Sequence, residues 1–154
     1  MKWTLHIPIT LTTANARVVN GAHAATAAIY RRHRDACALA LTVAARNAGV
    51  PTFTETADAH FRYVRLVRLY TGRQRAWDSD NLVAACKALR DACQLPRLWR
   101  GRWIPGAAIV VDDSATWSAW TYAQERAADG VAAVRIEVSE PTTAGPVSAR
   151  SDER

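Results

Sequence analysis

The sequence predicts a single-domain α/β protein of the α+β type, in which two main helices pack on a mixed β-sheet. Three observations lead to this prediction. The chain has 154 residues, enough for one hydrophobic core but too few for two ordinary domains. Its hydrophobic share of 49% is typical of a folded protein. Segments with two-residue and with helical apolar spacing alternate along the chain, in the order β-α-β-α-β-β-β.

The first half of the chain contains two predicted strands and one predicted helix. A strand is expected at residues 3–9, where Pro8 restricts it to an edge or an end of the sheet. An alanine-rich helix is expected at 22–47, because its apolar residues recur at helical spacing and Gly49 follows as a stop signal. A basic strand of partly alternating pattern is expected at 61–70.

The second half contains the other helix and three further strands. The helix is expected at 81–93, where one face is apolar, and a short apolar strand at 107–111. Two more strands, at 117–126 and 131–138, are expected to form a hairpin, because an Asp-Gly turn signal lies between them.

The domain is expected to cover residues 1–138, followed by a flexible tail at 139–154 that is rich in Pro, Thr and Ser. No apolar run approaches the roughly 20 residues that span a bilayer. The N-terminus lacks the uninterrupted apolar segment of a signal peptide. We therefore expect a cytoplasmic protein that is not inserted in a membrane.

The chain is basic, with 20 Lys and Arg against 14 Asp and Glu and a net charge of +6. Only Lys2 and Lys87 are lysines, so the positive charge is mostly arginine. The planar guanidinium can bind two phosphate oxygens at once, which favours a nucleic-acid partner. A GC-rich genome would produce the same bias toward arginine and alanine, so the charge alone leaves both explanations open.

Two acidic pairs stand at the ends of predicted core elements. Asp78 and Asp80 precede the second helix, and Asp112 and Asp113 follow the apolar strand. Mg²⁺ prefers hard oxygen ligands and activates water for phosphodiester hydrolysis, so converging pairs would suit a metal-dependent nuclease. The alternative is structural: Asp80 or Asn81 is an ordinary helix N-cap, and Asp112 and Asp113 form an ordinary turn.

These blocks carry a family resemblance. Residues 78–82, Asp-Ser-Asp-Asn-Leu, and residues 112–114, Asp-Asp-Ser, resemble the D-x-D-N-L … D-D-[SA] signature of the RusA-type Holliday junction resolvases. The similarity runs from about residue 3 to 138, but only these two blocks are specific. The resemblance implies an α/β homodimer, in a bacterial cell or a phage-infected host. Such a dimer cuts four-way DNA junctions with Mg²⁺ during recombination and repair.

The resemblance also implies the residues of the site. The metal ligands would be Asp78, Asp80 and Asp113, with Mn²⁺ able to substitute for Mg²⁺. The family's catalytic lysine would fall at position 84, where this chain has alanine. We expect Lys87, about one helical turn further on, to take its place and offset charge on the transition-state phosphate. The alternative for Lys87 is an i, i+4 salt bridge to Asp91.

Several arginines are candidates for DNA contacts. Those near the acidic block in sequence are Arg65, Arg68, Arg73 and Arg75. Residues 94–108 are an insertion relative to the family pattern, and they add Arg100 and Arg102 beside Trp99 and Trp103. Interleaved charges and aromatic rings suit contact with DNA, while the tryptophans could instead pack on the core or in a dimer interface.

Other classes fit less well. A restriction-endonuclease-like site requires a lysine two residues after an acid, and neither lysine is so placed. An HNH-type site requires clustered histidines, whereas the four histidines are scattered. Three cysteines without a C-x-x-C motif predict small buried side chains. Two alternatives stay open: a non-catalytic DNA-binding protein of the same fold, and a structural protein in which the acids only form turns.

Overall fold

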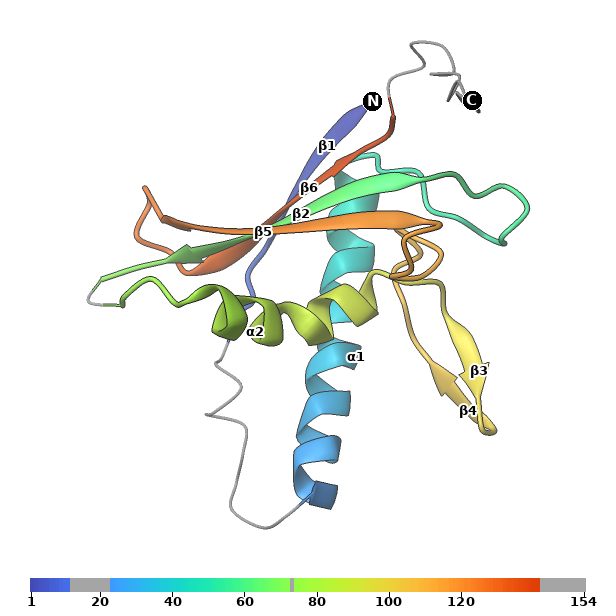
Figure 1. Ribbon diagram of the computed structural model, residues 1–154, viewed down its shortest axis with the longest axis horizontal. Coiled ribbons are helices and arrows are strands. Elements are labelled where there is room, and N and C mark those ends of the chain that lie inside the picture. The colour runs from blue at the N-terminus through green and yellow to red at the C-terminus, as the bar shows by residue number, and fades with distance from the viewer. Residues whose placement is uncertain (12–22, 73, 142–154) are drawn as a thin grey trace, which may run out of the picture.

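The computed structural model describes residues 1–11, 23–72 and 74–141, which form a sheet with two helices on one face (Figure 1). The main helices are α1 (His23–Asn47) and α2 (Ser79–Ala92). The strands are β1 (Lys2–Ile7), β2 (Arg62–Tyr70), β3 (Arg97–Trp99), β4 (Arg102–Ile104), β5 (Ser118–Arg126) and β6 (Ala133–Ser139). The predicted α+β class, with two helices on a mixed sheet, is confirmed.

The four long strands lie in the order β1-β6-β2-β5. β6 pairs antiparallel with both β1 and β2, while β2 and β5 are parallel. A parallel pair requires a crossover, which α2 and the segment after it supply. β1 lies at one edge, as the proline after it predicts.

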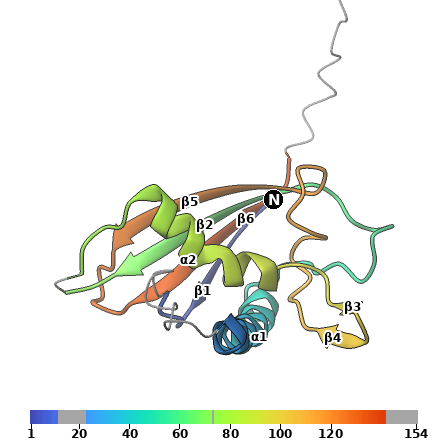
Figure 2. The ribbon, with the colours of Figure 1, turned by 60° about the horizontal axis from the view of Figure 1, so that its bottom comes forward.

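The hydrophobic core fills the space between the helices and one face of the sheet. The apolar stripe predicted for α2 is buried, and the three free cysteines are buried in the same core. The strands contribute alternate residues to this core, namely Leu5, Ile7, Val64, Leu66, Val134, Ile136 and Val138. The two helices cover this one face of the sheet (Figure 2). On the opposite face, charged side chains pair across strands, for example Arg135 with Glu125 at 2.8 Å.

Two of the predictions for the second half are wrong. β5 and β6 do not form a hairpin, because β2 lies between them. Residues 107–111 are not a strand. They form a buried segment whose amides bind the last carbonyls of α2, including Ile109 N to Cys93 O at 2.8 Å and Ala107 N to Ala92 O at 2.8 Å. The apolar run therefore reflects burial under the helix end and not pairing in the sheet.

The insertion at 94–108 contains the β3–β4 hairpin, which was not predicted from the sequence. Its turn residues, Arg100 and Gly101, both have positive φ, at 49° and 74°. That backbone is typical of a two-residue hairpin turn, which glycine favours. The hairpin stands away from the sheet, beside α1 (Figures 1 and 2).

The boundary placed after residue 138 is also too early. Ser139 belongs to β6, and the backbone amide of Glu140 donates to the carbonyl of Met1 at 3.1 Å. Residues 142–154, most of the predicted tail, lie outside the described residues. Neither described helix is long and apolar enough to cross a membrane.

A buried arginine joins this end of the sheet to the loops around it. The side chain of Arg62 is fully buried, and its guanidinium donates to the carbonyls of Pro51 at 2.7 Å and Ile109 at 2.8 Å. It also pairs with Glu140 at 3.2 Å and lies 4.2 Å from the ring centroid of Phe53. Arg62 is therefore a structural residue at the start of β2.

Candidate functional site

The D-x-D-N-L block forms the first turn of α2. Asp78 is the N-cap, with extended backbone, and its carboxylate accepts from both the amide and the side chain of Asn81, each at 2.8 Å. These hydrogen bonds hold the pKa of Asp78 below its usual range, so it is ionised at neutral pH. Asp80, two residues on, is exposed in the first turn. The helix dipole stabilises both negative charges there.

The second acidic pair lies near the start of β5. Asp112 accepts from the amide of Ser114 at 2.8 Å, and its carbonyl accepts from Ser118 at 2.9 Å. Asp112 and Asp113 thus form the ordinary turn that was the alternative to a metal-binding role. Asp113 pairs with Arg90 of α2 at 3.2 Å, and 38% of its side chain is exposed.

Arg90 in turn joins Asp113 to the sheet. Its guanidinium donates to the hydroxyl of Tyr122 on β5 at 3.2 Å. Burial raises the pKa of Tyr122, although Arg90 opposes that shift. Asp113 is therefore held by a salt bridge at the C-terminal half of α2.

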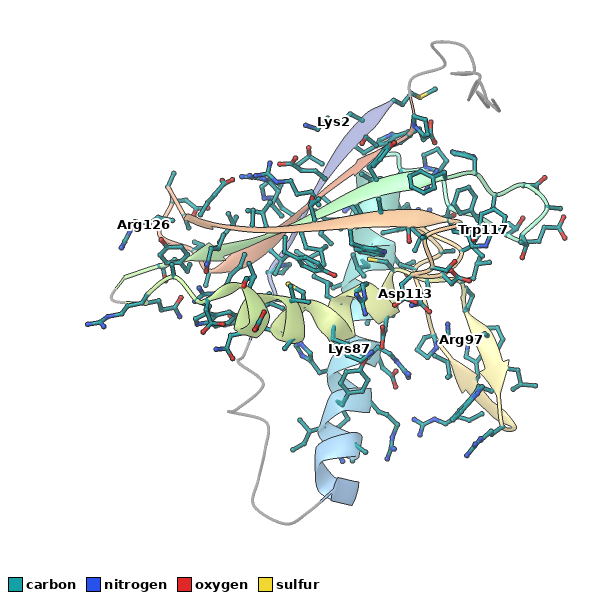
Figure 3. The ribbon with its side chains drawn as sticks, viewed as in Figure 1. Lys2, Lys87, Arg97, Asp113, Trp117 and Arg126 are labelled. Carbon is teal, nitrogen blue, oxygen red and sulfur yellow. The ribbon has the colours of Figure 1, made fainter. Side chains whose placement is uncertain are left out.

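The three predicted metal ligands are not brought together in one chain. Asp78 caps the start of α2, whereas the partner of Asp113 is Arg90, twelve residues further along the helix and about 18 Å away along its axis. Figure 3 shows Asp113 beside the C-terminal end of α2. Within the ranges that the structure describes, no three His, Cys, Asp or Glu side chains form a group that could hold a metal ion.

Lys87 forms the i, i+4 salt bridge to Asp91 that was the alternative to a catalytic role. Its ammonium group pairs with Asp91 at 3.1 Å, and the same carboxylate accepts a hydrogen bond from Tyr30 of α1. Lys87 lies seven residues after Asp80, about 10 Å along the helix axis. Asp91 therefore ties α2 to α1 through Tyr30, and Lys87 lies close to α1 in Figure 3.

The arginines expected to position phosphate have different surroundings. Arg65 lies on the open face of the sheet, where it is half-exposed and pairs with Glu137 at 3.5 Å. Arg75 is exposed. Arg73 lies outside the described residues.

Arg68 is buried, with 5% of its surface exposed, and its guanidinium lies 3.6 Å from the ring centroid of Trp77. It donates to the carbonyl of Arg75 and to the side chain of Gln124, both at 3.2 Å. The expectation of a phosphate contact at Arg68 is therefore corrected: this side chain orders the loop before α2. The sequence signal for burial was its two-residue spacing from Val64 and Leu66.

Arg100 and Arg102 lie on the β3–β4 hairpin, and both are exposed. Trp99 and Trp103, on the same hairpin, are 56% and 60% exposed, so neither packs into the core of this chain. The alternation of charged and aromatic residues in the insertion was the signal for a surface element. Its hairpin geometry was not predicted.

Comparison of the chain with protein-family models, with curated proteins and with solved structures found no match.

Proposed function

We propose that this protein is a DNA-binding endonuclease that cuts four-way junctions, as its resemblance to the RusA-type resolvases implies. The observation that carries the proposal is the D-x-D-N-L block at the start of α2, which presents the carboxylates of Asp78 and Asp80 in one fixed, exposed turn. The net charge of +6, from 20 basic and 14 acidic residues, supports a polyanionic substrate.

The fit of a metal to these residues is incomplete. Mg²⁺ is commonly bound through one or two protein carboxylates together with water and substrate phosphate. Asp78 and Asp80 could provide the two carboxylates. Asp113 lies toward the other end of α2 and is already paired with Arg90. The three acids of one chain therefore do not fit a single Mg²⁺ site, and we assign no metal-dependent step to them together.

A second copy of the chain would resolve this separation. α2 is anchored near both ends, because the amide of Trp77 binds Gln124 at 2.9 Å and Arg90 binds Tyr122 at 3.2 Å, both on β5. With α2 held in place, Asp113 could reach the start of the helix within one chain only by giving up its salt bridge with Arg90. We therefore propose a homodimer in which Asp113 of one copy lies near Asp78 and Asp80 of the other.

A non-catalytic DNA-binding protein of the same fold is the second candidate. One specific observation favours it: Lys87 is held by Asp91, about two helical turns from Asp80. In such a protein the acids near the DNA would only repel phosphate, so replacing Asp80 with asparagine would tighten binding.

A cleavage assay on a synthetic four-way junction with Mg²⁺ distinguishes the two. We expect the wild type to cut and Asp80→Asn to bind the junction without cutting it. Asp58→Asn, which changes an exposed acid in the loop before β2, is the matched control and should cut normally. Failure of the wild type to cut any branched DNA would refute the nuclease proposal.

Mixed dimers test where the acids meet. Asp80→Asn and Asp113→Asn should each inactivate the homodimer. A heterodimer of the two variants would then hold one site with both defects and one site with neither, so it should recover nicking. A heterodimer that stays inactive would show that the acids do not act across two copies.

A further inference from the structure

The β3–β4 hairpin is an arm with two chemically different faces. The directly opposed residues are Arg97 and Ile104, Leu98 and Trp103, and Trp99 and Arg102. Opposed residues share a face and the faces alternate along each strand, so Trp99 and Arg102 lie on one face and Leu98 and Trp103 on the other. The arm therefore carries a cationic, aromatic face and an apolar face.

The cationic face borders a cavity of about 350 Å³ between the arm and α1. α1 contributes Arg31 and Arg34, and the arm contributes Trp99, Arg100, Arg102 and Ile104. Figure 2 shows the arm standing beside α1. A cavity of this size suits a small ligand or a single residue of a polymer.

The cavity has an excess of positive charge. Four guanidinium groups line it, and the carboxylate of Asp35, which pairs with Arg34, offsets one of them. No salt bridge to Arg31, Arg100 or Arg102 is present in the part of the chain that the structure describes. Arg34 is only 8% exposed, so the cavity includes a cation that is largely removed from water. Such a set of guanidinium groups is suited to phosphate, which they can bind through paired hydrogen bonds.

An aromatic surface completes the cavity. The guanidinium of Arg100 lies 4.5 Å from the ring centroid of Trp99, whose side chain still has 56% of its surface exposed. Proteins that bind single-stranded nucleic acid combine cationic grooves with exposed aromatic rings on which bases stack. The cavity holds both elements side by side.

We propose that this cavity binds one unpaired nucleotide of DNA, with its phosphate on the arginines and its base on Trp99. The inference rests on the DNA-binding part of the proposed function and is independent of cleavage. An unpaired base is favoured over a duplex, because a base within a duplex is already stacked on both faces. An acidic peptide would match the charge but leave the indole without a planar partner. The arm would thus recognise the open centre or a frayed end of a branched substrate.

The two tryptophans provide a matched pair of variants for the test. Trp99→Ala removes the ring that lines the cavity, while Trp103→Ala removes an equally exposed ring from the opposite face of the same hairpin. Binding of a labelled oligothymidylate is measured by fluorescence anisotropy, with a blunt duplex of the same length for comparison. We expect Trp99→Ala to weaken binding of the single strand about tenfold and Trp103→Ala to leave it unchanged.

The arginines are tested through the salt dependence of the same binding. Each phosphate contact to a single strand contributes about 0.7 to the slope of log K against log salt concentration. Arg102→Gln should therefore lower the slope by about 0.7, whereas Arg46→Gln, at the exposed far end of α1, should leave it unchanged. Circular dichroism verifies that each variant is folded.

Three results would overturn the proposal. Trp99→Ala could bind the oligonucleotide as tightly as the wild type, or both tryptophan variants could lose affinity equally. Polyglutamate could compete as effectively as oligothymidylate, which would identify a general anion site. These results are distinct from failure of the proposed nuclease function, in which the wild type binds single-stranded DNA but cuts no junction.

Discussion

Replacing Gly106 with alanine tests how the arm is joined to the body of the protein. Gly106 lies at the neck of the arm, where the chain returns past the residues that follow α2. A Cβ atom added there would lie 2.0 Å from the carbonyl oxygen of Gln94 and 3.1 Å from the carbonyl carbon of Leu95. Both neighbours are backbone atoms, so no side chain can rotate away to relieve the contact.

The expected cost follows from this geometry. Restoring the shortest contact from 2.0 Å to the 3.0 Å below which such contacts are essentially never seen requires the two segments to separate by about 1 Å. The buried hydrogen bond from the amide of Ala108 to the carbonyl of Gln94, now 3.1 Å, would be lost or strained. Overpacking costs about 1–3 kcal/mol and an unsatisfied buried group about 1–3 kcal/mol, so we expect a loss of about 2–6 kcal/mol.

Urea denaturation followed by tryptophan fluorescence measures this loss as a decrease in the free energy of unfolding. Gly130→Ala is the control, because a Cβ there meets no atom within 4 Å and only its positive φ of 72° is strained. That variant should lose about 1–2 kcal/mol. If Gly106→Ala were as stable as the wild type, the close packing of the neck would be refuted.

Two further predictions concern the buried arginine at the start of β2. Arg62→Ala should lower the free energy of unfolding by about 3–5 kcal/mol, because it leaves two carbonyls without their donor and removes the salt bridge from Arg62 to Glu140. Arg62→Lys should recover only part of this loss in urea denaturation. Stability should also fall in acid, because the pKa of Glu140 lies below its usual range in the folded protein. Desolvation raises the pKa of this carboxyl, but hydrogen bonds from His60 and Arg62 lower it further than burial raises it. The stabilisation is therefore present above the ordinary glutamate pKa of about 4.3 and is lost as pH falls through the lower folded value. Urea midpoints at neutral and acidic pH should differ less in Glu140→Gln than in the wild type, and an equal difference would contradict this role of Glu140.

The local features of the acidic site were predictable because they depend on neighbouring residues. The sequence predicted an N-cap at Asp80 or Asn81, but the structure gives that role to Asp78 and places Asp80 and Asn81 in the first turn of α2. The spacing of Lys87 and Asp91 predicts an i, i+4 pair, which forms at 3.1 Å. Each interaction closes within one helical turn, so sequence spacing alone specifies it.

The distance between the two acidic blocks could not be predicted in this way. It depends on the direction in which α2 crosses the sheet and on the path of the chain after it. Because residues 107–111 pack under the end of α2 instead of adding a strand, Asp113 is placed beside Arg90 and away from Asp78. A strand ending at Asp113 would have positioned that carboxylate differently.

Apolar periodicity was enough to predict the long strands and the buried stripe of α2, since each reflects which side of an element faces away from water. In α1 the helix was predicted correctly, but the apolar residues Ile29, Leu39 and Val43 are exposed, and Cys37, Leu41 and Ala45 face the core instead. Periodicity does not specify the partner of a strand. β6 has the alternation expected of either arrangement, and only its insertion between β1 and β2 buries Val134, Ile136 and Val138 against the helices. In the same way, the composition of the insertion indicated a basic, aromatic surface, but its hairpin register selects Trp99 and Arg102 for the cavity beside α1. Local chemistry is encoded by residues close in sequence, whereas strand order, the separation of the acids and the cavity arise from contacts between residues far apart in the chain.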